Sequence, residues 1–430
     1  MLAAAAMLKH PLPAAPTMSD PIPAYNRRGL SIGLAFACLF VASLPFHHLH
    51  TFRSTALGAA ALATFVSGGW RELWLLPLKA PWWTWIVVAG VSVVFALQPW
   101  ISLSEYRYEV LYAFGAWATC YTLARRHDGA RWLARALVVT TLVALVVGLA
   151  LFAPDQRWFD LGRFGDVGTV STYFVMVLPL FLLFALRAAP RSAERTGALV
   201  VAGACVAAGS LTLNRTFWLA AAAEITIFAL FSMRYWSSRY RKASMLGVGT
   251  LVAMLALVQV LTASESRMAI AAPGGDIWDF LSSDPRGDLW QFALSRIAQH
   301  PWIGAGLGKW TSAGFFVEKF DDPLLMHAHN TFLNRALETG LPGLAAFVYL
   351  LLSVAIAFRR VARSGDGDTA AIGAAGLALV IGVVVKNLTD DFFVRQNALL
   401  FWALVGAGLG AAAAREDRAP AARVSNTAAA

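Results

Sequence analysis

Residues 167–186 read VGTVSTYFVMVLPLFLLFAL, an uncharged stretch between Asp166 and Arg187. A helix needs roughly 20 apolar residues to cross the hydrocarbon core of a bilayer, so this stretch predicts a transmembrane helix. The whole chain shares this character, since 58% of its 430 residues are hydrophobic, 14% are charged and the mean hydropathy is +0.60. An average soluble chain is about 45–50% apolar and about 25% charged. The composition therefore excludes a soluble globular protein and a disordered chain, and it predicts an integral membrane protein.

Similar apolar stretches recur along the chain and predict an all-α polytopic membrane protein with about 12 transmembrane helices. The predicted helices centre near Ala37, Ala61, Ala89, Phe114, Leu142, Val177, Ala204, Ile225, Met254, Val348, Leu379 and Leu404. Lys and Arg gather in the loops on one side, as in Arg125-Arg126 and Arg359-Arg360. Since cytoplasmic loops carry an excess of basic residues, both termini are predicted to be cytoplasmic. The same bias accounts for the net charge of +10 without a nucleic-acid partner.

This topology divides the chain into five predicted segments. They are a disordered cytoplasmic N-terminus (1–28), transmembrane helices 1–9 (29–262), a long periplasmic loop with the catalytic motif (263–336), transmembrane helices 10–12 (337–414) and a cytoplasmic tail (415–430). A loop as long as the third segment is uncommon unless it is functional. Asp284-Pro285 is a helix-start signal, and the apolar spacing from Asp288 to Ala298 predicts an amphipathic helix at the membrane surface.

Two patterns in the long loop have unremarkable interpretations when each is taken alone. Gly304-x-Gly306-x-Gly308 resembles a phosphate-binding loop, but no strand precedes it, so a turn between loop helices is the better interpretation. His327-Ala328-His329 has no further Cys, Asp or Glu at metal-ligand spacing. Alone, this pair predicts no more than a capping or hydrogen-bonding role where the chain enters a transmembrane helix.

A longer motif gives the second pattern a specific meaning. His329-Asn330 is followed by nine residues, Gly340, two residues and Gly343. This spacing resembles the signature of bacterial O-antigen ligases (WaaL-type), which belong to a wider superfamily with Wzy-type O-antigen polymerases and O-oligosaccharyltransferases. The many predicted spans and the one long extracytoplasmic loop are similar to the family as well.

The resemblance implies a membrane glycosyltransferase of the Gram-negative inner membrane with a periplasmic active site. It would transfer a glycan from undecaprenyl pyrophosphate to a sugar hydroxyl of lipid A–core, completing lipopolysaccharide. The partners implied are these two substrates and the lipid bilayer, with no nucleic acid, and the chain is expected to be a monomer or weak oligomer. No cofactor and no metal are expected, because arginine can offset the charge of a pyrophosphate.

Four residues are predicted to be catalytic. The register of the motif selects His329 as the base, since histidine titrates near neutral pH. Arg215 occupies the position where the family places a functional arginine before the next span. Arg286 opens an Arg-Gly-x-x-Trp stretch at a predicted helix start, where N–H groups also attract phosphate. The ligases carry a functionally important Asp near the end of the corresponding span. In this chain Asp390 and Asp391 both follow the eleventh predicted span, and we prefer Asp391 for that role.

The predicted substrate-binding residues are Arg163, His327, Asn330, Asp390, Lys386 and Arg395. The topology puts the basic members of this set on the same side as His329. Arg163 lies where family members often carry Arg-x-x-Gly, although the Asn-Pro that commonly follows is absent. Glu224 is alone within its predicted span and should face the interior of the bundle.

Two alternatives stay open. A Wzy-type polymerase or a protein O-oligosaccharyltransferase would use the same donor with another acceptor. A transporter or flippase would carry ionisable residues along several spans and an internal repeat. Neither feature is found in the sequence, which disfavours a transporter. The proposed transfer is a single displacement, which would invert the anomeric carbon.

Overall fold

The computed structural model describes residues 26–126, 128–152, 159–232, 286–322 and 325–428. Helices account for the regular structure of these residues, which contain no strand. The first half comprises α2 (Arg27–Ser43), η1 (His47–Leu49), α3 (His50–Val66), η2 (Gly69–Trp74), α4 (Lys79–Val94), α5 (Pro99–Tyr106), η3 (Arg107–Leu111), α6 (Tyr112–Arg126), α7 (Gly129–Leu151), η4 (Gly162–Phe164), α8 (Val167–Arg187), α9 (Ala193–Leu211) and α10 (Arg215–Ser232). The second half comprises α13 (Arg286–Gln299), α14 (Lys309–Phe320), α15 (Thr331–Val361), α16 (Gly367–Lys386) and α17 (Arg395–Ala428).

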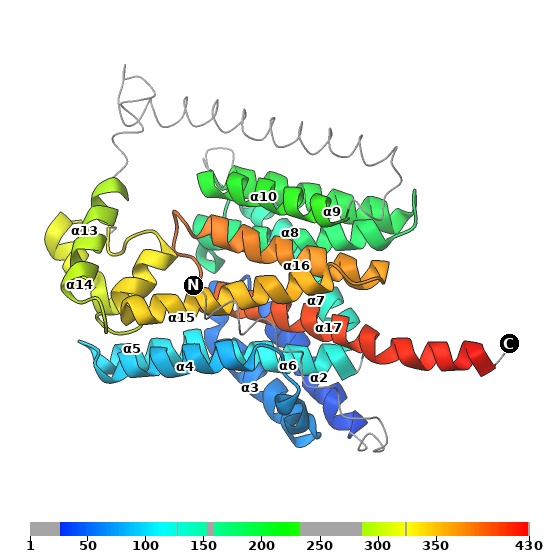
Figure 1. The fold of residues 1–430 in the computed structure, drawn as a ribbon. Coiled ribbons are helices and arrows are strands. Elements are labelled where there is room, and N and C mark those ends of the chain that lie inside the picture. Colours follow the sequence, from blue (N-terminus) through cyan, green and yellow to red (C-terminus); the bar gives the residue numbers. More distant parts are fainter. Residues whose placement is uncertain (1–25, 127, 153–158, 233–285, 323–324, 429–430) are drawn as a thin grey trace.

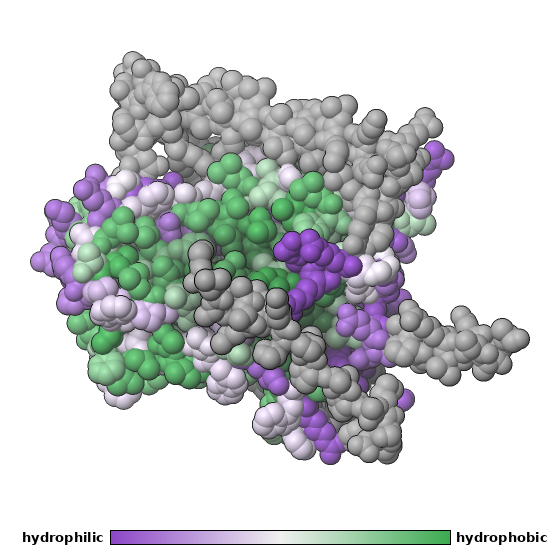
Figure 2. Space-filling view, in the orientation of Figure 1, coloured by the Kyte–Doolittle hydropathy of each residue, from purple (hydrophilic) through white to green (hydrophobic). Residues whose placement is uncertain are grey.

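Five described helices are long and apolar enough to cross a membrane. They are Gly129–Leu151, Val167–Arg187, Thr331–Val361, Gly367–Lys386 and Arg395–Arg418. Apolar side chains cover the middle of the face shown in Figure 2, and hydrophilic ones gather toward its two ends. These features confirm a helical membrane protein, and the number of twelve spans stays a prediction. Each predicted span centre lies in a helix except Met254, which falls outside the described residues.

The long helices lie alongside one another in one bundle, as Figure 1 shows. α17 packs against α6, and α16 lies against α8, α10 and α15. A cluster of buried tryptophans joins the first half of the chain to the last helix: the ring of Trp82 is 5.5 Å from that of Trp117 and 4.5 Å from that of Trp402. This aromatic packing joins α4, α6 and α17 in the core of the bundle.

Side-chain caps begin several of these helices where the sequence places Asp, Asn or Ser. The Asp166 carboxylate accepts from the Thr169 amide at 2.8 Å at the start of α8, and Ser192 caps α9 in the same way. Asp366 caps α16. Asn330 caps α15, so the residue beside His329 also fixes where that helix begins.

Two predicted spans depart from a regular helix. The span near Phe114 consists of α5, a π-helical turn from Arg107 to Leu111, and α6. The span near Val348 begins at Thr331, inside the segment assigned to the loop, and contains a kink at Gly340. The amphipathic helix predicted from Asp288 to Ala298 is confirmed as α13, and Gly304–Gly308 forms the predicted connection to α14.

Candidate active site

The His327–Asn330 segment lies between α14 and α15 in the chain. Hydrogen bonds connect it to α13 and to α15. The Trp290 indole of α13 donates to the Ala328 carbonyl at 2.9 Å, and the Ala328 amide donates to the Asn334 side chain at 3.0 Å. His329 itself has a positive φ of 46°. A non-glycine residue in this region is uncommon, and here the hydrogen bonds on either side of it hold the backbone in place.

The two histidine rings lie against each other, with their centroids 4.1 Å apart and their planes tilted by 33°. Burial lowers the pKa of His327 to about 4. Burial also lowers the pKa of His329 below its ordinary 6.5, although the Asp390 carboxylate opposes this effect. The charges of Arg286 and Lys309 lower the pKa of His329 further. At neutral pH both imidazoles are therefore uncharged and able to accept a proton.

Asp390 is a buried carboxylate surrounded by donors from three elements. Lys386, at the end of α16, donates from Nζ to Oδ2 at 2.6 Å. Asn214 and Thr216, at the start of α10, each donate to the same oxygen at 3.0 Å. Arg286 of α13 lies 3.8 Å from Oδ1. Burial alone would raise the pKa of Asp390, but the charge and hydrogen bond of Lys386, the hydrogen bond of Asn214 and the charge of Arg286 together hold that pKa below its usual value, so the carboxylate is ionised.

Asp391 has different partners although it is the next residue. Thr331 donates to its Oδ1 at 2.9 Å, and the Asn334 amide donates to its Oδ2 at 2.5 Å. Both donors lie in the first turn of α15. Asp390 therefore faces the cationic groups, whereas Asp391 holds the helix that follows His329.

The predicted substrate-binding residues fall into two groups. Asn330 and Lys386 belong to the network around Asp390 and Asp391: the Asn330 amide donates to the Leu388 carbonyl at 2.7 Å, and Lys386 is fully buried against Asp390. Arg163 and Arg395 lie elsewhere. Arg163 is exposed in η4 with its guanidinium 4.9 Å from the Phe164 ring centroid, and Arg395 donates to Glu105 at 3.0 Å.

Arg215 is the first residue of α10, and its side chain lies outside what the structure describes. Its neighbours on both sides, Asn214 and Thr216, bind Asp390. The backbone at Arg215 is therefore next to the Asp390 cluster, and a functional role for its side chain stays a prediction.

Sequence analysis missed a second group of buried charges. Arg335 of α15 forms ion pairs with Glu338 at 2.6 Å and with Glu109 of the π-helical turn. All three side chains are at most 4% exposed. Glu109 lies in the predicted span near Phe114 and Glu338 at the start of the predicted span near Val348. Acidic residues inside predicted membrane helices were thus the signal that could have found this group.

Gly340 of the motif serves the fold. Its φ is +69°, and a Cβ placed there would stand 2.5 Å from the Trp302 backbone. Across this contact the Leu341 amide donates to the Pro301 carbonyl at 2.7 Å, and the Ala305 amide donates to the Leu337 carbonyl at 2.8 Å. Gly340 thus lets the segment that leads into α14 lie directly on the kink of α15.

Residues 180–348 match a family model described as O-antigen ligase. The matched segment contains Arg215, Arg286, His329 and both glycines of the motif, and it ends before Asp390. No curated protein matches the chain. The match includes the motif and supports the resemblance to the superfamily of ligases and polymerases. Among the residues that the structure describes, no three His, Cys, Asp or Glu side chains are grouped so as to hold a metal ion.

Proposed function

We propose that this protein is an O-antigen ligase of the inner membrane, which transfers a glycan from undecaprenyl pyrophosphate to a sugar hydroxyl of lipid A–core at the periplasmic face. The observation that carries the proposal is that the segment of His329 is hydrogen-bonded to the segment of Asp390, whose carboxylate binds Lys386 and lies near Arg286, at one end of a membrane bundle. The family match to residues 180–348 supports the same class of reaction.

His329 suits the role of general base. Its ring is uncharged at neutral pH, so it can take the proton of the acceptor hydroxyl as the oxygen attacks the anomeric carbon. The new carbon–oxygen bond forms as the bond to the pyrophosphate oxygen breaks, and undecaprenyl pyrophosphate leaves. One displacement of this kind inverts the anomeric carbon and needs no metal.

The cationic groups suit the leaving pyrophosphate. Arg286 is 31% exposed and begins α13, so its guanidinium can face a substrate while it stays near Asp390. Arg215 adjoins the same cluster through its two neighbours. Lys386 is completely buried, and we assign it and Asp390 the role of positioning these groups. Asp391 orients α15 and thereby His329.

We assign contacts with the substrates or their surroundings to Arg163, Arg395, His327 and Asn330.

A polymerase or an O-oligosaccharyltransferase would use the same groups on the same donor, so the acceptor separates these proposals from ours. A transporter is disfavoured because it would not need a base beside a cation cluster.

Transfer by the purified full-length protein tests the proposal. The substrates are undecaprenyl-pyrophosphate-linked glycan and rough lipopolysaccharide, with and without a chelator. His329→Ala and Arg215→Ala should each lower transfer by about 10²-fold or more, the usual range for a lost general base or a lost charge-stabilising donor. His300→Ala is the matched control, since His300 is exposed and follows α13.

Elongation of the donor glycan without transfer to rough lipopolysaccharide would replace the ligase by the polymerase. Full transfer by His329→Ala would refute the proposed base, and loss of transfer with the chelator would refute the metal-independent mechanism.

A further inference from the structure

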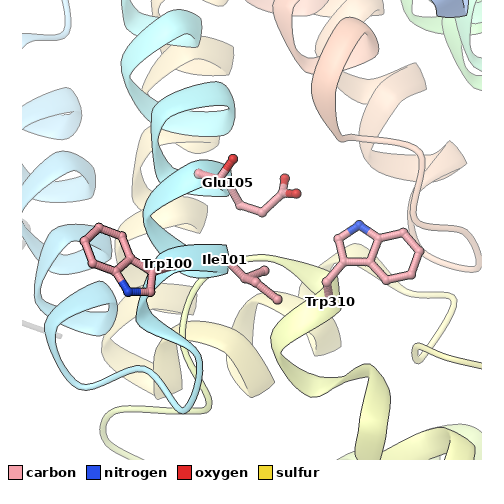
Figure 3. Close-up of a pocket in the computed structure, with 5 residues that line it drawn as sticks. Trp100, Ile101, Glu105 and Trp310 are labelled. Carbon is pink, nitrogen blue, oxygen red and sulfur yellow. The ribbon is translucent and has the colours of Figure 1, made fainter.

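A cavity of about 490 Å³ lies between α5 and α14, at the end of the bundle that carries α13. Its lining residues are Trp100, Ile101, Ser104, Glu105 and Trp310. Figure 3 shows Trp100 and Trp310 on opposite sides, with Ile101 and the Glu105 carboxylate between them. The cavity is open at the surface, since Trp100 is 83% and Trp310 is 42% exposed. The predicted catalytic residues do not line it.

The Glu105 carboxylate is fixed at the wall of this cavity. Its side chain is only 7% exposed, and Arg395 donates to Oε1 at 3.0 Å. No described residue donates to Oε2. Gly308 packs against the same side chain, since a Cβ there would stand 2.7 Å from the Glu105 Cβ. A carboxylate held in this way offers a fixed acceptor to a ligand that carries hydroxyl groups.

The cavity is close to the candidate active site. Trp310 follows Lys309 at the start of α14, and Lys309 is near enough to both His327 and His329 for its charge to lower their pKa values, after the larger effect of burial. Arg395, which holds Glu105, comes four residues after Asp391. One wall of the cavity is thus continuous with the segments that carry the base and the cation cluster.

We propose that this cavity is a saccharide subsite, which binds a sugar unit of the donor or acceptor glycan beside the unit that reacts. The inference rests on the proposed function. Indole faces pack well against the C–H faces of sugar rings, and the Glu105 carboxylate can accept from their hydroxyls. A hydrocarbon chain would fit the tryptophans, but it would leave the buried carboxylate without a polar partner on its open side.

The test uses the full-length protein in liposomes, with donor and rough lipopolysaccharide varied in turn. Trp310→Leu removes the flat aromatic face and keeps apolar bulk, and Glu105→Gln keeps an acceptor for Arg395. We expect each to raise the KM for one of the two glycans by about tenfold, the loss of roughly one stacking or hydrogen-bonding contact, with kcat little changed. Trp310→Tyr should restore much of the loss. The substrate whose KM rises identifies the glycan that binds there.

Trp302→Leu is the matched control, because Trp302 is 72% exposed and does not line the cavity. A second measurement does not depend on transfer: binding of the delipidated core oligosaccharide, and of the glycan released from the donor, to wild type and to Trp310→Leu. Absence of transfer by wild type would overturn the proposed function alone. Unchanged KM values in Trp310→Leu, or equal binding of both oligosaccharides by the two proteins, would overturn the subsite and favour a hydrocarbon chain in the cavity.

Discussion

Asp390→Asn removes the negative charge from the centre of the cation cluster and leaves the shape of the side chain almost unchanged. The Lys386 side chain is 0% exposed and that of Asp390 is 5% exposed, so the ammonium has no water to replace its partner. Removing one member of a buried ion pair costs about 3–5 kcal/mol. At about 1.4 kcal/mol for each factor of ten, this is a change of roughly 10²- to 10⁴-fold in the unfolding equilibrium.

Thermal unfolding of the purified protein in detergent measures this cost. Asp368→Asn is the matched control, because Asp368 pairs with Arg187 and with Arg415, and its side chain is 46% exposed while each arginine side chain is 34% exposed. Exposed pairs of this kind contribute at most about 1 kcal/mol. Asp390→Asn should therefore melt several degrees below wild type and Asp368→Asn close to it.

The double variant Asp390→Asn/Lys386→Met separates stability from function. Replacing a buried ion pair by apolar side chains is often neutral, so most of the lost stability should return. Transfer should stay low, because Arg286 has lost the carboxylate that positions it. If Asp390→Asn melts like wild type, the buried ammonium does not depend on this carboxylate and the reasoning is wrong. If the double variant transfers at the wild-type rate, Asp390 has a structural role only.

Three further outcomes follow from the same network. Burial lowers the pKa of His329, so kcat/KM should fall with decreasing pH with a midpoint below the ordinary 6.5. A midpoint above 6.5 would contradict a neutral, buried base. Gly340→Ala should lower the melting temperature, because it adds backbone strain of about 1–2 kcal/mol and a clash with the segment before α14. Gly314→Ala is the control: open space surrounds Gly314, so this variant should melt at or above the wild-type temperature. Equal melting of Gly340→Ala and wild type would refute the role of the kink. Arg335→Met should prevent accumulation of folded protein in membranes, because the buried carboxylates of Glu109 and Glu338 lose their counter-charge. Wild-type levels of the folded variant would show that these carboxylates are protonated instead.

The helices and the motif could be predicted from the sequence because both are local signals. The apolar stretches alone predicted where the described helices lie. Asp284-Pro285 predicted the start of α13, and the glycines from Gly304 to Gly308 predicted the connection after it. The approach of Asp390 to the histidine segment also followed from topology, since both were predicted at the periplasmic ends of neighbouring spans.

The ion pairs that complete this end of the bundle could not be predicted in the same way. Arg335 meets Glu109, which is 226 residues away, and Arg395 meets Glu105, which is 290 residues away. Periodicity carries no information about such pairs. A π-helical turn places Glu109, and a π-turn shifts the helix face by an amount that a regular helical pattern does not anticipate.

The contacts of the motif divide its residues between chemistry and folding. The Asn330 side chain accepts from the Phe332 and Leu333 amides at 2.9 Å and 3.1 Å, which is the role of an N-cap. The Thr331 amide then donates to the carbonyls of Asn387 and Asp390, each at 3.1 Å, so the start of α15 is bound to the segment that carries the carboxylates. Gly340 supplies the positive φ of the kink. Among these positions only His329 has no such task in the fold, and it is the one whose chemistry fits the proposed base.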